Sequence, residues 1–184
     1  MDKPVERGVP KVLLVLIILI LAAMYYYAAY RDYSNPEVAV RNFYNAYFQK
    51  DYETVAQNLS VFWGVQFMPE YMLMSPRELI EDRPAIEKKM GDFISRVETG
   101  TKLPAGMSIK ILPQYTQRTE NTALVAYEFK EKDKSAGMEM ALLLKEKKRM
   151  YILKMMPVNQ EQLQQLNGQD ISDLEQSFKA MLGR

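Results

Sequence analysis

The spacing of the apolar residues changes from a helical to a strand period a little past the middle of the chain, and this change most constrains the fold. In 36-PEVAVRNFYNAYFQKD-51 the residues Val40, Phe43, Tyr44, Tyr47 and Phe48 lie on one face of a helix. After a loop at 99–106 the period becomes two. We predict strands over 109–115, 122–130, 138–145 and 150–158. The sequence therefore predicts an α+β fold in which a helical half precedes a four-stranded antiparallel meander.

Helix start signals divide the helical half into segments. Pro36 suits the first turn of a helix, and Asp51 can cap a second, short one. Ser75 and Glu78 form a capping box that starts another helix, which we expect to be interrupted near residues 82–84 and to continue to 97. Its expected buried face is Ile86, Met90, Phe93, Ile94 and Val97. The aromatic segment 61–74 is interrupted by Gly64 and Pro69, and it predicts short strands or irregular structure.

Both faces of the predicted sheet are apolar in its middle, so each face needs a cover. On 138–145, Met138, Met140 and Leu142 lie on one face and Ala141 and Leu143 on the other. The long helix can cover one face. Either the tail 159–184 or a second copy of the protein would cover the other. The tail reads as two amphipathic helices separated at Gly168, with a second capping box at Ser172 and Glu175.

The segment Val12 to Tyr30 contains 19 uncharged residues, which as a helix would be about 28 Å long. Because no small residue lies three positions before a candidate cleavage alanine, we predict a retained single-pass transmembrane helix over 12–30. The basic residues before it place the N-terminus, 1–11, in the cytoplasm and the later domain outside a bacterial cell membrane. A linker would follow at 31–35. The tyrosines expected at the lipid interface are Tyr25, Tyr26, Tyr27 and Tyr30.

The composition excludes several classes of site. The chain has no cysteine and no histidine, which excludes disulfides, zinc sites of the Cys/His kind and a Ser-His-Asp triad. From Arg31 onward there are 21 basic and 21 acidic residues, so no nucleic-acid partner is expected. We predict no catalytic residues, no metal and no cofactor. The carboxylates weighed as a general base are Asp51, Asp82 and Glu128, and helix capping or a solvated position is the simpler interpretation of each.

The segment 40-VRNFYNAYFQKDYETVAQNLS-60 resembles the opening of the NTF2-like (cystatin-like α+β) superfamily, where an aromatic-rich helix runs into a "K-D-Y" turn and a second short helix. The resemblance covers 36–158 and implies a cone of helices packed on a curved antiparallel sheet. A membrane span followed by such a domain is similar to VirB8-like components of secretion and conjugation machines. Sheet-to-sheet dimers are frequent in the superfamily, so the resemblance also implies a homodimer or a membrane-protein assembly as partners.

Aromatic side chains are the candidate ligand-binding residues, because aromatic walls are usual for apolar pockets. They either line the mouth of the cone or fill its core. The set is Tyr44, Tyr47, Trp63, Phe67, Tyr71, Tyr115 and Tyr127. The predicted function is non-enzymatic binding of a small ligand or a partner outside the cytoplasm. The alternatives are a structural component of a VirB8-like apparatus and, third, an enzyme that uses a buried carboxylate.

Overall fold

The computed structural model describes residues 11–30 and 35–182. The chain divides into two compact units, Met1–Asp32 and Tyr33–Arg184, and each is described by itself. The first unit contains the helix α1, Lys11–Tyr30, in which side chains are described from Val15 to Met24. The predicted segment 1–10 and most of the linker 31–35 lie outside the described residues, as do the side chains of the four predicted interface tyrosines.

The predicted transmembrane helix is not supported. Among the described residues, no helix is both long enough and apolar enough to cross a membrane. This finding contradicts the single-pass anchor, and with it the predicted cell-membrane localisation.

The second unit begins with helices, of which the first starts at Asn35, a cap that was not predicted, and two later ones start at predicted caps. In α2, Pro36–Phe48, the Asn35 side chain accepts from the amides of Glu37 and Val38. Asp51 caps α3, Tyr52–Ala56, by accepting from the Thr54 amide at 3.1 Å. The Ser75–Glu78 capping box starts α5, Pro76–Glu81, and α6, Arg83–Val97, follows directly. Ile86, Met90 and Ile94 are buried, whereas Val97 is exposed.

The segment 61–74 is helical and not extended, contrary to its prediction. It forms α4, Val61–Val65, and a 3₁₀ turn at Pro69–Tyr71. The Ser60 hydroxyl accepts from the Phe62 amide at 3.2 Å, which supplies an N-cap for α4. Local capping and packing against α6 therefore outweigh the strand preference of the aromatic and β-branched residues.

The second half is a curved antiparallel sheet in the order β1–β3–β4–β5, with β2 paired to β3. Its strands are β1 Met107–Ile111, β2 Gln117–Arg118, β3 Thr122–Glu131, β4 Lys134–Glu146 and β5 Arg149–Pro157. Tyr115 was expected at the end of the first strand but lies in a 3₁₀ turn, Pro113–Tyr115, because Pro113 cannot continue the ladder. Lys132 and Asp133 both have positive φ, as a two-residue hairpin turn requires.

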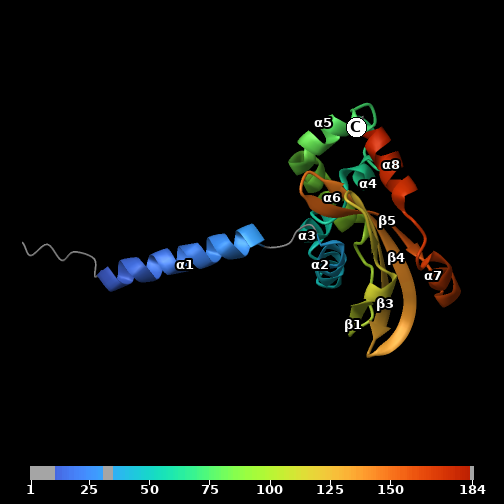
Figure 1. Cartoon of the computed structure of the whole chain (residues 1–184), viewed down its shortest axis with the longest axis horizontal. Helices are drawn as coiled ribbons and strands as arrows, with labels where there is room; N and C mark the ends of the chain where they lie inside the picture. The colour runs from blue at the N-terminus through green and yellow to red at the C-terminus, as the bar shows by residue number, and fades with distance from the viewer. Residues whose placement is uncertain (1–10, 31–34, 183–184) are drawn as a thin grey trace, which may run out of the picture. The chain divides into compact units, whose positions relative to one another are not determined.

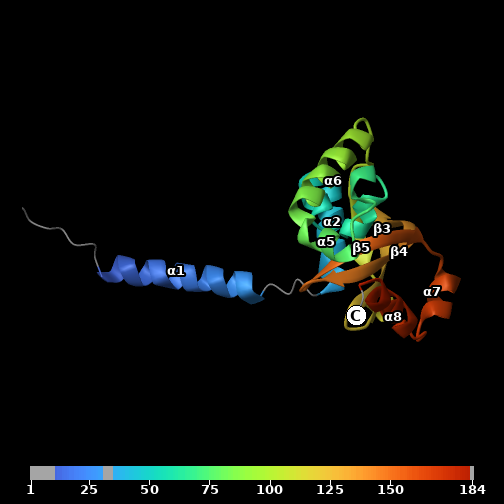
Figure 2. The ribbon, with the colours of Figure 1, turned by 90° about the horizontal axis from the view of Figure 1, so that it is seen from above.

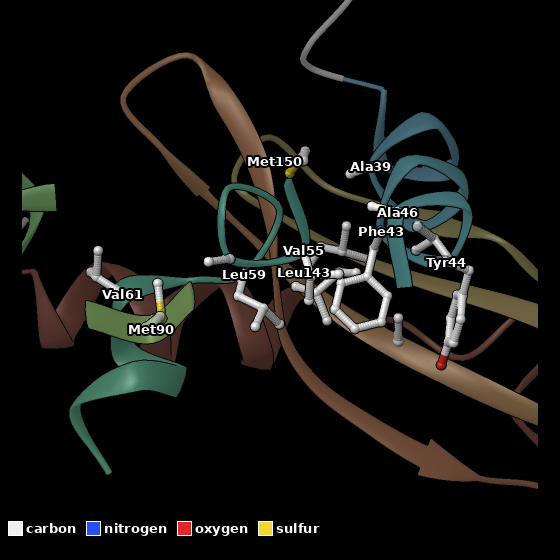
Figure 3. Close-up of a cluster of buried hydrophobic side chains, with 14 of the residues drawn as sticks. Ala39, Phe43, Tyr44, Ala46, Val55, Leu59, Val61, Met90, Leu143 and Met150 are labelled. Atoms are coloured by element: carbon white, nitrogen blue, oxygen red, sulfur yellow. The ribbon is translucent and has the colours of Figure 1, made fainter. Parts of the chain in front are cut away.

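Figures 1 and 2 show α2 and α6 on one side of this sheet and α7 and α8 on the other. The main core lies on the first side, where Phe43 of α2 packs beside Val55, Leu59 and Leu143 (Figure 3). On the second side, Leu163 of α7 is 1% exposed and packs with Ala126 and Met140 of the sheet. Of the two covers that the sequence left open for the second face, the chain's own tail packs on it.

The tail forms α7, Gln160–Leu166, and α8, Ser172–Met181. A capping box that the sequence analysis missed joins Asn159 and Gln162 at the start of α7. The predicted box of Ser172 and Glu175 is wrong. Instead, Asp170 accepts from the Ser172 amide, and Glu175 accepts from the Asn121 amide and side chain at 3.0 and 2.8 Å. Glu175 does not complete a capping box because its carboxylate accepts hydrogen bonds from Asn121 in the turn before β3.

Candidate functional site

A cavity of about 530 Å³ lies between the helices and the sheet of the second unit. Such a volume is within the range of small-molecule sites. α2, α6, β3 and β4 all contribute to its wall, which is mostly aromatic and aliphatic. The lining includes Phe43, Tyr44, Tyr47, Phe48, Trp63, Phe67, Phe93, Val97, Glu98, Phe129 and Glu139.

One polar group in the wall is the carboxylate of Glu139 on β4. Glu139 stands directly across the ladder from Tyr127 of β3. Its Oε2 accepts from the hydroxyl of Tyr127 at 2.7 Å and from that of Tyr44 at 3.0 Å, and the two hydroxyl oxygens are 2.8 Å apart. Burial, together with the neighbouring carboxylate, raises the pKa of both tyrosines well above the ordinary value. Both hydroxyls therefore stay protonated and act as donors.

Glu98, at the C-terminal end of α6, is the second carboxylate of the wall. Its Oε2 accepts from the Tyr47 hydroxyl at 3.1 Å. Burial and the nearby Glu98 charge raise the pKa of Tyr47 to about 12. The rings of Tyr44 and Tyr47 are neighbours on α2, with centroids 6.5 Å apart. One face of α2 thus presents a phenolic donor to each carboxylate.

Aromatic rings of the cavity wall pack in two groups. Tyr44 lies against Phe129 with ring centroids 5.1 Å apart in an edge-to-face arrangement. On another part of the wall, Phe67 stacks on Phe93 at 5.0 Å and contacts Trp63 at the same distance. Phe67 and Val97 are substantially exposed, so they lie where the cavity meets solvent.

Four of the seven predicted ligand-binding residues line this cavity, namely Tyr44, Tyr47, Trp63 and Phe67. Tyr127 lies behind the wall, fully buried, and contacts the wall residues Tyr44 and Glu139. Tyr71 is buried elsewhere, with Lys89 over its ring at 4.7 Å. Tyr115 packs on the opposite face of the sheet, among the residues covered by α7.

Several wall residues were not predicted as part of the site. Phe43 and Phe48 share the helical stripe of Tyr44, and Phe129 shares the strand face of Tyr127, so periodicity alone could have added them. Phe93 was expected in the core. Glu98 and Glu139 carried no usable signal, since finding Glu139 requires the register that places it beside Tyr127.

The three carboxylates weighed as catalytic bases have other roles or lie elsewhere. Asp51 caps α3, and hydrogen bonds from Thr54 lower its pKa. Asp82 occupies the N-cap position of α6 but makes no side-chain capping bond. Glu128 pairs with Lys130 at 2.8 Å, and hydrogen bonds from Lys130 and Ser135 lower its pKa. A lowered pKa opposes a role as general base at neutral pH.

Comparison with known proteins adds no relative: no family model, no curated protein and no solved structure matches this chain.

Proposed function

We propose that the second unit binds a small, largely apolar ligand in the cavity and catalyses no reaction on it. The observation that carries this proposal is the cavity of about 530 Å³ with a wall that is almost entirely aromatic and aliphatic. Burial of an apolar ligand against such a wall is favourable by about 25 cal/mol per Å² of apolar surface removed from water. The resemblance to the NTF2-like superfamily is part of the same proposal, in which the cavity corresponds to the interior of the cone.

The arrangement of polar groups supports binding over catalysis. The hydroxyls of Tyr44, Tyr47 and Tyr127 are held protonated and already donate to carboxylates. The assembly alternative drew on the VirB8-like layout and, in part, on the need to cover the second face of the sheet. Because α7 packs on that face, its apolar residues do not by themselves favour a partner.

The test uses N-phenyl-1-naphthylamine, a neutral apolar probe that becomes fluorescent in apolar surroundings. Trp63 is the single tryptophan of the chain and lines the cavity, so energy transfer from its indole reports binding there. We expect the full chain to bind the probe with transfer from Trp63.

The matched variants are Val97→Phe and Val97→Ala, at an exposed helical position of the wall. The larger side chain is expected to weaken the probe's affinity at least about tenfold, or about 1.4 kcal/mol, while the smaller one leaves it nearly unchanged. Exposed aliphatic side chains of α1 can also take up the probe, so the readout is the difference between variants. Equal affinities with unchanged energy transfer in all three proteins would count against the proposal.

A further inference from the structure

The two carboxylates of the cavity wall have no basic partner among the described residues. No ion pair joins Glu98 or Glu139 to a lysine or arginine in this part of the chain, and the cavity lining contains no basic side chain. The tyrosine hydroxyls hold the carboxylates in place but supply no positive charge. A cavity of this kind has a negative electrostatic potential inside an apolar wall, where charges are weakly screened.

The aromatic rings of the wall also favour a positively charged ligand. The face of a phenyl, phenol or indole ring attracts cations, most strongly where water is excluded. Here Tyr44 donates to the Glu139 carboxylate, and its ring packs against Phe129. Tyr47 donates to Glu98, and its ring stacks with Phe43. Carboxylates and ring faces together are suited to an ammonium group and disfavour an anion.

We infer that the ligand is an organic cation, an ammonium head group on an apolar body. This inference rests on the proposed binding function and specifies its ligand class. The apolar body would lie against Trp63, Phe67 and Phe93, and the ammonium would pair with Glu139 or Glu98. The ligand supplies the positive charge that the cavity wall lacks.

The experiment compares three probes that share one body: 4-phenylbutylamine, 4-phenylbutan-1-ol and 4-phenylbutanoate. Their affinities for the full chain are measured by calorimetry and by the emission of Trp63, with displacement of N-phenyl-1-naphthylamine as the competition assay. We expect the amine to bind about 10-fold to 100-fold more tightly than the alcohol, because hydrogen bonds to charged groups are the stronger kind. The carboxylate is expected to bind most weakly.

The variant Glu139→Gln keeps an acceptor for the two tyrosine hydroxyls but removes the charge. It should reduce the amine's advantage over the alcohol. Glu98→Gln, at the C-terminal end of α6 and outside the sheet, tests the second carboxylate independently of folding in the sheet. The matched control is Glu128→Gln on the neighbouring strand, where the carboxylate already pairs with Lys130. That control should leave the amine's advantage intact. Circular dichroism of each variant verifies its fold.

The outcomes separate the two proposals. If the alcohol displaces the neutral probe and the amine binds no more tightly, the cavity binds ligands but the cation inference is wrong. If the amine's advantage persists in both Glu139→Gln and Glu98→Gln, the charge acts elsewhere and the inference is again wrong. If neither the neutral probe nor any of the three compounds binds, both the binding function and the cation inference are overturned.

Discussion

The cluster of Tyr44, Tyr127 and Glu139 concentrates several energetic effects at the residue scale. Glu139 belongs to the helix-facing side of β4, among residues that are otherwise apolar. A carboxylate in such a place is costly unless it is hydrogen-bonded, and two phenolic donors provide those bonds. The cluster therefore keeps a charge at the cavity wall that the surrounding core would otherwise disfavour.

Tyr127→Phe should destabilise the fold by about 1.5–3 kcal/mol, because it removes a hydrogen bond to a charged acceptor that burial leaves without a substitute. The free energy of unfolding from urea titrations measures this effect. Tyr115→Phe is the matched control, since Tyr115 only accepts from the exposed Gln160 on the other face, and its cost should stay below about 0.5 kcal/mol. If both variants lose the same free energy of unfolding, the buried hydrogen bond of Tyr127 contributes no more to stability than the exposed one of Tyr115.

Sequence reasoning found the aromatic part of the site and missed its charged part for a physical reason. The helical spacing of aromatic residues such as Tyr44 and Tyr47 is enough to predict that they lie on one face of a helix. Glu139 is brought to Tyr127 only by strand pairing, and Tyr115 leaves the predicted face because Pro113 ends the strand before it. Pairing across strands depends on the whole sheet and has no local signature.

At the scale of elements, caps explain both the successes and the failures of prediction. Ser75 with Glu78 and the isolated cap Asp51 start helices where the sequence indicates. Ser60 also caps a helix, but the strand-forming residues after it concealed that role. In the tail, Glu175 binds Asn121 instead of capping, and so fastens α8 to the turn before β3.

The attachment of α8 should depend on pH in the acid range. Burial of the Glu175 carboxyl opposes ionisation, but hydrogen bonds, including those from Asn121 and Lys179, outweigh it and lower its pKa from 4.5 to about 2. A pKa that folding lowers contributes stability above the unfolded value, and this contribution is lost as the pH falls from 4.5 toward 2.

Thermal unfolding at pH 7, 4 and 2.5 measures the contribution of Glu175. The melting temperature of the wild type should fall more across this series than that of Glu175→Gln, which has no carboxyl to titrate. Glu120→Gln, at an exposed carboxylate 3.9 Å from the same Lys179, is the control and should follow the wild type. Parallel curves for wild type and Glu175→Gln would contradict the assigned role.

At the scale of the whole second unit, one sheet separates two apolar layers. The larger layer under α2 and α6 contains the cavity, and the smaller layer under α7 contains none of its lining residues. The α+β order and the antiparallel meander were predictable, because alternating and helical periods repeat over long segments. The tail was one of two covers that the sequence left open for the second face. The membrane anchor predicted for 12–30 was not supported by the structure.

Removal of residues 159–184 should expose the second layer and cause self-association, since Leu163 and Leu166 no longer cover Ala126 and Met140. Light scattering at several protein concentrations measures the mass in solution. A chain that ends at Gly168 retains α7 and should keep the mass of the full chain. If the chain ending at Val158 also keeps that mass, the tail is not what protects this face.

Because the sheet is covered on both faces, the central strand β3 has no outward-facing positions over its first half. Thr122 and the five residues after it, up to Tyr127, are all buried in succession. An ordinary surface strand tolerates polar replacements at every second residue, but here neighbouring residues pack into different layers. Substitutions along this strand should therefore be accepted slowly over an unbroken block of six positions, and a mutational scan should show that block in place of the usual alternation.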